Sequence, residues 1–196
     1  MIEAVNPVAS KIPDWMVAEM PQGYQTRLNE IERLSAELKE MDGIGCVMWA
    51  MGEVLTDAVR ALFAALKCDV DSKPGNMPAI AVSLGGSRRL LITVAGVSSP
   101  IQKTNEELTH SFQAVQHAGQ NDRVVLVVNS TPARPPADRH TPILPDALDV
   151  LKKMGVNVLT TVTLFRLWRQ SLENQQKARQ ALDYLYQQDG GQFPHQ

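Results

Sequence analysis

Two pairs of acidic residues have a spacing that could bind a divalent cation. Glu53 and Asp57 lie four residues apart in a segment expected to be helical, which places both carboxylates on one helix face. Asp69 and Asp71 lie two residues apart in a short predicted strand, where side chains alternate between faces. Carboxylate oxygens are the ligands that Mg²⁺ and Mn²⁺ prefer. The four residues are therefore either a candidate metal site or acids that face water.

Gln113 and His117 form a further polar pair, four residues apart near the end of a predicted helix. This pair either lines a site or belongs to the polar surface. The other histidines and the two cysteines make no metal-ligand pattern: His110, His140, His195, Cys46 and Cys68. Both cysteines are expected to be buried, reduced thiols. The chain also lacks a nucleophile elbow, a P-loop and the glycine motif of dinucleotide-binding folds.

Basic residues occur in two clusters that could form a rim around a site. Arg88 and Arg89 follow a Gly-Gly turn, and Arg134, Arg139 and His140 lie in a Pro-rich loop. If the two clusters do not converge, they are scattered surface charge. The whole chain has 19 basic and 21 acidic residues, giving a net charge of −2. Nucleic acid is therefore a possible partner that the composition does not favour, because non-specific binders are normally more basic.

The elements that must position these residues are led by the segment AIAVSLGGSRRLLITVAG, residues 79–96. Two apolar runs flank Gly85 and Gly86, and a glycine pair tolerates the positive φ of a hairpin turn, so we predict a β-hairpin. The continuous apolar run at 122–129 predicts a strand that is covered on both faces. The remaining elements expected are helices at 54–67, 105–119, 146–155 and 163–188, and strands at 68–71 and 156–161.

This order of elements predicts an α/β (α+β) fold. Helices separate the later strands, and such crossovers connect parallel neighbours, whereas the hairpin requires an antiparallel pair. We therefore expect a mixed central sheet with helices on both faces. This domain is expected to cover residues 46–188, followed by a disordered tail over residues 189–196.

A helical appendage is expected in front of this domain. Apolar residues recur there at spacings of three and four: Tyr24, Leu28, Ile31, Leu34, Leu38 and Met41. The pattern predicts an amphipathic helix over 24–43, which is too short to be stable alone and must pack on its own domain or on a second copy. The heptad-like spacing favours a short coiled coil, so we expect a homodimer through residues 24–41. Residues 1–23 show no period and are expected to be a flexible arm.

The order of elements over residues 46–170 is an opening helix, then a strand, a hairpin, a helix and a strand. This order resembles the core of the restriction-endonuclease-like, or PD-(D/E)XK, nuclease superfamily. LGGSRRLLITVAG looks like the part of that core that holds the active site. The chain after VVLVVN resembles one bacterial branch with uncharacterised members. The pair Gln113 and His117 is similar to the glutamine–tyrosine pair of some branches, with the histidine in the place of the tyrosine.

The resemblance implies three motif positions. In the superfamily an acid on each hairpin strand holds a metal that activates water, and a lysine two residues beyond the second acid helps to position that water. The corresponding positions are Ala79, Thr93 and Ala95, and none has the required side chain. Some members use an acid from the preceding helix, which leaves Glu53, with Asp69 or Asp71, as relocated metal ligands.

We therefore expect a catalytically inactive nuclease-fold domain that acts as a dimeric binding or scaffolding module without a cofactor. The residues expected to contact its ligand are Glu53, Thr93, Gln113, His117 and Arg88. One alternative is a metal-dependent nuclease that uses Mg²⁺ or Mn²⁺ at the relocated acids. Another is a small-molecule or peptide-binding α/β domain with its site near Asn129 and Thr160, at the ends of parallel strands.

The expected compartment is the cytoplasm. The chain has no apolar run of the length that a membrane span needs, and its first fifteen residues lack the pattern of a signal peptide. With 44% hydrophobic and 20% charged residues, the composition is that of an ordinary globular chain, and no membrane partner is expected.

Overall fold

The computed structural model describes residues 14–71 and 79–194 of the chain. The chain divides into two compact units, residues 1–41 and residues 42–196. The first unit contains α1 (Asp14–Glu19) and most of α2 (Tyr24–Gly45). A flexible arm was expected over residues 1–23, and residues 1–13 of this segment lie outside the described residues. Residues 14–19 form a helical turn and a half rather than irregular chain.

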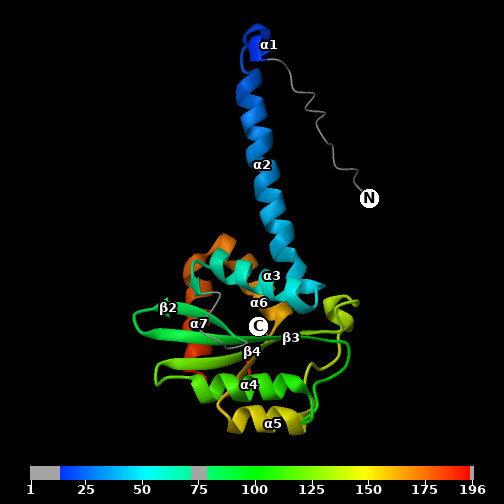
Figure 1. Ribbon diagram of the computed structural model, residues 1–196, viewed down its shortest axis with the longest axis vertical. Helices are drawn as coiled ribbons and strands as arrows, with labels where there is room; N and C mark the ends of the chain where they lie inside the picture. The colour runs from blue at the N-terminus through cyan, green and yellow to red at the C-terminus, as the bar shows by residue number, and fades with distance from the viewer. Residues whose placement is uncertain (1–13, 72–78, 195–196) are drawn as a thin grey trace. The chain divides into compact units, whose positions relative to one another are not determined.

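Among the described residues, six strands form one mixed sheet in the second unit (Figure 1). The strands lie side by side in chain order: β1 (Asp69–Asp71), β2 (Ile80–Gly85), β3 (Arg88–Val97), β4 (Asp122–Ser130), β5 (Asn157–Thr160) and β6 (Gly191–Gln192). β1, β2 and β3 pair antiparallel with one another, and the pairs from β3–β4 to β5–β6 are parallel. The fold is therefore the mixed α/β arrangement that the sequence predicts.

The predicted hairpin is the β2–β3 connection. Gly85 and Gly86 both have positive φ, 98° and 63°, which is the backbone that the tight turn requires. The apolar runs on either side are long enough to pair from Ile80 with Ile92 up to the turn. β3 then continues through Gly96 and aligns with the whole length of β4. Most residues of these two central strands are buried on both faces of the sheet.

Helices cover both faces of the sheet (Figure 1). One face packs on α3 (Gly52–Ala65), α6 (Thr161–Glu173) and α7 (Gln175–Gln187), and the other on α4 (Glu106–His117) and α5 (Pro145–Lys153). Alternation along β3 sends Leu90 and Ile92 into the first layer and Leu91 and Ala95 into the second. The described part of the domain also contains the short 3₁₀ helices η1 (Cys46–Met48) and η2 (Pro136–Asp138).

The C-terminal part of the chain differs from the prediction at two places. The single helix expected over 163–188 is two helices, because Asn174 ends α6 and its Oδ1 accepts the backbone N–H of Lys177 at 3.1 Å as the cap of α7. A disordered tail was expected over residues 189–196; residues 195–196 lie outside the described residues, and residues 189–194 are ordered against the domain. β6 extends the sheet next to β5, and the N–H of Gly190 donates to Asn157 Oδ1 at 2.9 Å.

Gly190 explains why the chain can approach the sheet so closely at this point. Its φ is 77°, and a Cβ on this residue would lie 2.7 Å from the carbonyl oxygen of Lys152. Phe193 then inserts into the core below α6 and α7. These contacts are made with residues far apart in sequence, so the local sequence at the C-terminus does not predict them.

α2 is the predicted amphipathic helix, and it continues to Gly45. Its one buried residue among those described is Ile44, which belongs to the second unit. Its apolar residues are otherwise half-buried or exposed, with Ile31, Leu34, Leu38 and Met41 all exposed. Within the described residues, no helix, α2 included, is long and apolar enough to span a membrane.

Candidate functional site

The three motif positions lie together on one face of the β2–β3 hairpin. Ile80 pairs with Ile92, so Ala79, one residue earlier, stands opposite Thr93. Ala95 lies two residues beyond Thr93 and shares its face because side chains alternate along a strand. The hairpin therefore brings Ala79, Thr93 and Ala95 to one location, between the sheet and the layer formed by α4 and α5.

This motif face is closed. Ala79, Thr93 and Ala95 are 7%, 2% and 3% exposed. The hydroxyl of Thr93 lies 3.3 Å from that of Ser111 on α4, and Ser111 Oγ donates to the carbonyl of Glu107 at 2.9 Å. The two alanines belong to the apolar cluster beneath α4 and α5. A metal ion placed there would lose its water without gaining a carboxylate, which is a large energetic cost.

The acids predicted as relocated metal ligands are not brought together. α3 begins against Gly96 of β3, where an added Cβ would meet the start of the helix at 3.3 Å, and Glu53 lies in its first turn. Asp69 and Asp71 lie on β1, the latter level with Leu91 of β3. Glu53 and Asp71 are therefore displaced from each other along the strands by the length from Gly96 to Leu91. That length is about 16 Å at roughly 3.3 Å per residue. In the part of the chain that the structure describes, no three histidine, cysteine or acidic residues are grouped as metal ligands.

The other predicted ligand residues lie on opposite sides of the sheet. Gln113 and His117 are exposed on α4, where His117 Nδ1 lies 2.8 Å from the carbonyl oxygen of Gln113. Arg88 Nη1 donates to Asp183 Oδ1 on α7 at 2.8 Å, and its guanidinium lies 5.5 Å from the centre of the Tyr186 ring. Because α4 and α7 cover different faces, these residues do not form one site.

Arg89 connects the starts of the two central strands. It donates two hydrogen bonds of 2.8 Å to the carboxylate of Asp122, which also accepts the N–H of Gly119 at 2.8 Å. Burial opposes ionisation of Asp122, but the bonds from Arg89 and Gly119 prevail, and the pKa of the carboxyl is lowered. The same hydrogen bonds raise the pKa of Arg89. Arg89 is therefore part of the framework.

Arg139, from the second basic cluster, is also held inside the fold. Its Nη1 donates to Asn129 Oδ1 at 2.8 Å, its Nε donates to the carbonyl of Arg134 at 3.0 Å, and its Nη2 donates to the carbonyl of Met48. Burial lowers the pKa of this guanidinium. Arg88 and Arg89 begin β3, whereas Arg134 and Arg139 follow the end of the parallel strand β4. The two basic clusters thus lie at opposite ends of the sheet and form no common rim.

Asn129 and Thr160, the centre of the alternative ligand site, are occupied by bonds within the chain. Asn129 Nδ2 donates to the carbonyl of Ala50 at 2.9 Å, and its Oδ1 accepts from Thr161 Oγ1 at 3.0 Å. Thr160 Oγ1 accepts the N–H of Thr163 at 3.2 Å and caps α6. Both residues are buried. The ends of β4 and β5 are therefore filled by framework contacts.

Both cysteines are free thiols. Cys68 is buried as predicted, and burial raises the pKa of its thiol to about 11, which makes it a poor nucleophile at neutral pH. Cys46 is only half-buried, at the start of η1.

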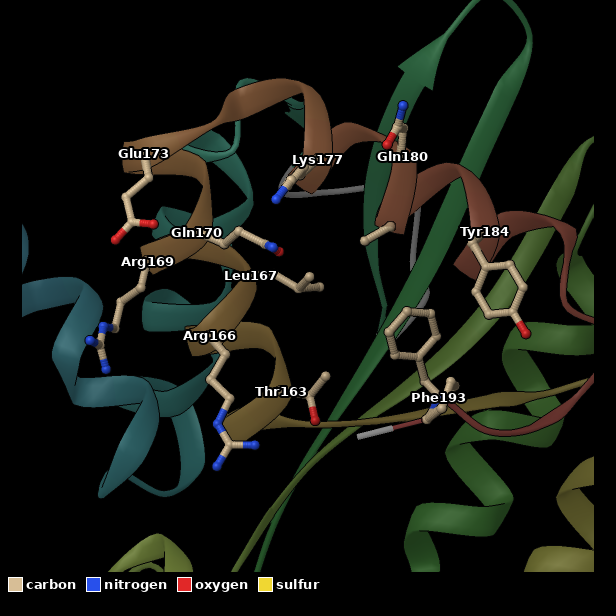
Figure 2. Close-up of a pocket in the computed structure, with 12 residues that line it drawn as sticks. Thr163, Arg166, Leu167, Arg169, Gln170, Glu173, Lys177, Gln180, Tyr184 and Phe193 are labelled. Carbon is tan, nitrogen blue, oxygen red and sulfur yellow. The ribbon is translucent and has the colours of Figure 1, made fainter. Parts of the chain in front are cut away.

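A groove of about 680 Å³ lies between α6 and α7 and is closed at one end by the C-terminal segment (Figure 2). Its buried residues are Thr163, Leu167 and Phe193, which form a largely apolar floor. Exposed side chains surround this floor: Arg166, Arg169, Gln170, Glu173, Lys177, Gln180, Tyr184 and Pro194. We call this concavity the α6/α7 groove.

The α6/α7 groove has a surplus of positive charge. Among the described residues that line it, Glu173 is the one acid, against Arg166, Arg169 and Lys177. None of the ion pairs formed between described residues includes any of these three cations. The positive end of the α7 dipole lies at Lys177 and adds to the same field. The groove therefore favours a negatively charged ligand.

This groove was not predicted from the sequence. If residues 163–188 were one helix, Arg166 and Lys177 would be about 16 Å apart along its axis, at 1.5 Å per residue. The break at Asn174 folds α7 back beside α6, so that residues of both helices line one concavity. The signal that could have found it is Asn174 itself, a preferred N-cap residue in the middle of an apparently continuous helix.

Compared with known protein families, with curated proteins and with solved structures, the chain matches none. The resemblance to the nuclease superfamily therefore stays a prediction from the order of elements and the residues of the hairpin.

Proposed function

We propose that this protein is a catalytically inactive domain of restriction-endonuclease-like fold that acts as a dimeric binding module. The closed motif face carries the proposal. Ala79, Thr93 and Ala95 share one face as the resemblance implies, yet they supply no carboxylate and no lysine, and α4 packs directly on them. The antiparallel hairpin within a partly parallel sheet supports the same comparison.

The test is cleavage by the full chain of supercoiled plasmid and of single-stranded DNA, in Mg²⁺ and in Mn²⁺. We expect no product above a protein-free control. The Glu53→Gln variant serves as the matched protein control, because Glu53 is exposed and begins α3, where a relocated ligand would lie. Cleavage by the unaltered protein that disappears in Glu53→Gln would overturn the proposal and favour the relocated metal site.

The α6/α7 groove is the surface to which we assign binding. It is concave, its cations have no carboxylate partners among the described residues, and Tyr184 presents an exposed aromatic ring. These features are typical of a ligand site, where a few polar groups surround an apolar floor. The motif face and the ends of β4 and β5 are filled by framework side chains instead.

The dimer is the second part of the proposal, and α2 supports it. Ile31, Leu34, Leu38 and Met41 line one side of the helix and are exposed. The opposite side carries Arg33, which pairs with Glu30 at 2.7 Å and with Glu37, so water-facing ion pairs occupy it. A short amphipathic helix gains most of its stability from packing its apolar face, and a second copy offers a matching apolar face.

Replacing Leu28 and Leu38 together by Glu is expected to convert the dimer to monomers in light scattering, because four charges would enter the paired face. The matched control is Thr26→Glu with Ala36→Glu, which adds the same charge to exposed positions of α2 outside the apolar side. This control should keep the dimer mass. An unchanged mass for the leucine variant would contradict pairing through α2.

A further inference from the structure

The α6/α7 groove is divided into a cationic side and an aromatic side. Arg166 and Arg169 extend from α6 and Lys177 from the start of α7, while Tyr184 and Phe193 stand on the other side of the floor (Figure 2). This separation suits a ligand with negative charge at one end and a flat ring at the other.

The cationic side is suited to more than one negative charge. Arg166 and Arg169 lie three residues apart and share a helix face. Each guanidinium presents a planar fork of donors that matches phosphate oxygens, and the ammonium of Lys177 adds a third charge. Glu173 lies at the outer end of this side and removes one charge from the total. A diphosphate group balances the field that remains.

The aromatic side offers a prepared surface for a ring. Tyr184 is 53% exposed, yet its ring is supported by Phe193 in an edge-to-face contact of 5.8 Å between centroids. Phe193 is itself buried, so it fixes the position of the tyrosine ring. An exposed aromatic ring held in this way loses little freedom when a planar base stacks on it.

Two amides also line the groove, one from each helix. Gln170 of α6 and Gln180 of α7 both line the groove and are exposed. A carboxamide has two donors and an acceptor, which are the groups that bind the edge of a nucleobase. The groove thus contains charged, stacking and hydrogen-bonding groups in one volume.

We propose that the α6/α7 groove binds a nucleoside diphosphate, with its phosphates among Arg166, Arg169 and Lys177 and its base on Tyr184. This inference rests on the proposed binding function and names the ligand class for it. The volume of about 680 Å³ falls within the usual range for small-molecule sites, about 300–1,000 Å³.

Calorimetric titration of the full chain with ADP, adenosine and pyrophosphate tests this proposal. ADP should bind, and adenosine and pyrophosphate should each bind about tenfold more weakly or worse, because each lacks one half of the contacts. Arg166→Gln with Lys177→Gln should weaken ADP binding at least about tenfold. Tyr184→Ala should weaken ADP binding by a similar factor, whereas Tyr184→Phe should retain it, because the ring rather than the hydroxyl makes the contact.

The matched control is Lys152→Gln with Lys153→Gln on α5, which removes the same charge from exposed positions on the other side of the sheet. This variant should bind ADP like the unaltered protein. Equal affinity for pyrophosphate and ADP, or equal losses in the control and groove variants, would overturn the nucleotide assignment. Absence of ADP binding at millimolar concentration would also overturn it, while the cleavage and light-scattering results would still decide the proposed function separately.

Discussion

The motif face of the β2–β3 hairpin and the α6/α7 groove are opposite cases of a candidate site. The motif face has the location that the proposed resemblance assigns to an active site, but it is filled: the hydroxyl of Thr93 contacts that of Ser111, and α4 covers the face. The groove has no motif behind it but is open, lined by Arg166 and Lys177 without carboxylate partners among the described residues. The difference teaches that the location implied by a resemblance and an open, charged concavity are separate features of this fold.

The motif face and the groove differ because polar side chains are buried at the first and exposed to water at the second. The hairpin lies at the centre of the sheet, where every unpaired charge would be desolvated, so only side chains with a specific partner are tolerated. The groove lies outside the sheet on two helices whose outer positions stay in water. Charges accumulate there at little cost to folding, and the turn at Asn174 gathers them.

Placing an acid on the motif face has the largest expected effect, and it tests the contrast between this buried face and the exposed groove. Thr93→Asp should lower the free energy of unfolding by about 3–5 kcal/mol, because a carboxylate would be buried beside Ser111 without a cation. The matched control is Gln170→Glu in the groove, which adds the same charge at an exposed position and should change stability by less than about 0.5 kcal/mol. Urea denaturation at pH 7 measures both.

A Thr93→Asp variant as stable as the control would contradict the closed motif face, because it would show that water or ions reach Thr93. Such a variant would then be assayed for cleavage in Mn²⁺, since an accessible carboxylate at that position could take part in metal binding.

A second test concerns the ion pair that joins the starts of the two central strands. Asp122→Asn should lower the free energy of unfolding by about 1.5–2 kcal/mol at pH 7, the lower part of the range for charged hydrogen bonds because Arg89 is half-exposed. Asp183→Asn, which breaks the more exposed pair with Arg88, is the control and should cost less than about 1 kcal/mol.

The pH dependence of this effect has a definite sign. The pKa of Asp122 is lowered in the folded protein, so its stabilisation is complete above the ordinary carboxyl pKa, about 4, and is lost as the pH falls through the lowered value. The difference between the unaltered protein and Asp122→Asn should therefore shrink between pH 5 and more acidic solutions. A difference that grows on acidification would contradict the ion pair as the source of stability.

The fold could be predicted wherever local pattern and tertiary structure agree. The hairpin follows from two apolar runs around Gly85 and Gly86, and β4 follows from the apolar run at 122–129, which the structure buries except at Arg123. β6 could not be predicted, because its two residues join the sheet through backbone hydrogen bonds to distant residues, from Gly191 N–H to Val156 and from Phe193 N–H to Val158, and through the close approach at Gly190. Those contacts have no local sequence signature.

The site was predicted less well than the fold, and for a related reason. Ala79, Thr93 and Ala95 were predicted to share one face, and the hairpin pairs Ile80 with Ile92 as that requires. The turn pairs Gly85 with Arg88, however, so this register is reached only through the irregularity between Ser83 and Gly85, which the sequence did not predict. Which polar residues remain unengaged depends on tertiary packing. Arg88 and Arg139 were expected to be available to a ligand or a basic rim, but both are held by residues distant in sequence, Asp183 and Met48.

The smallest expected change in stability is that of removing two cations from the α6/α7 groove, and it is compared with the change at the motif face. Arg166→Gln with Lys177→Gln should change the free energy of unfolding by less than about 0.5 kcal/mol, because both side chains are exposed and form no ion pair with a described residue. Urea denaturation at pH 7 would measure it beside Thr93→Asp. A loss above about 1 kcal/mol would show that these cations stabilise the α6–α7 pair. The groove would then be a framework element like the motif face, and a binding defect of the same variant could no longer be attributed to lost ligand contacts.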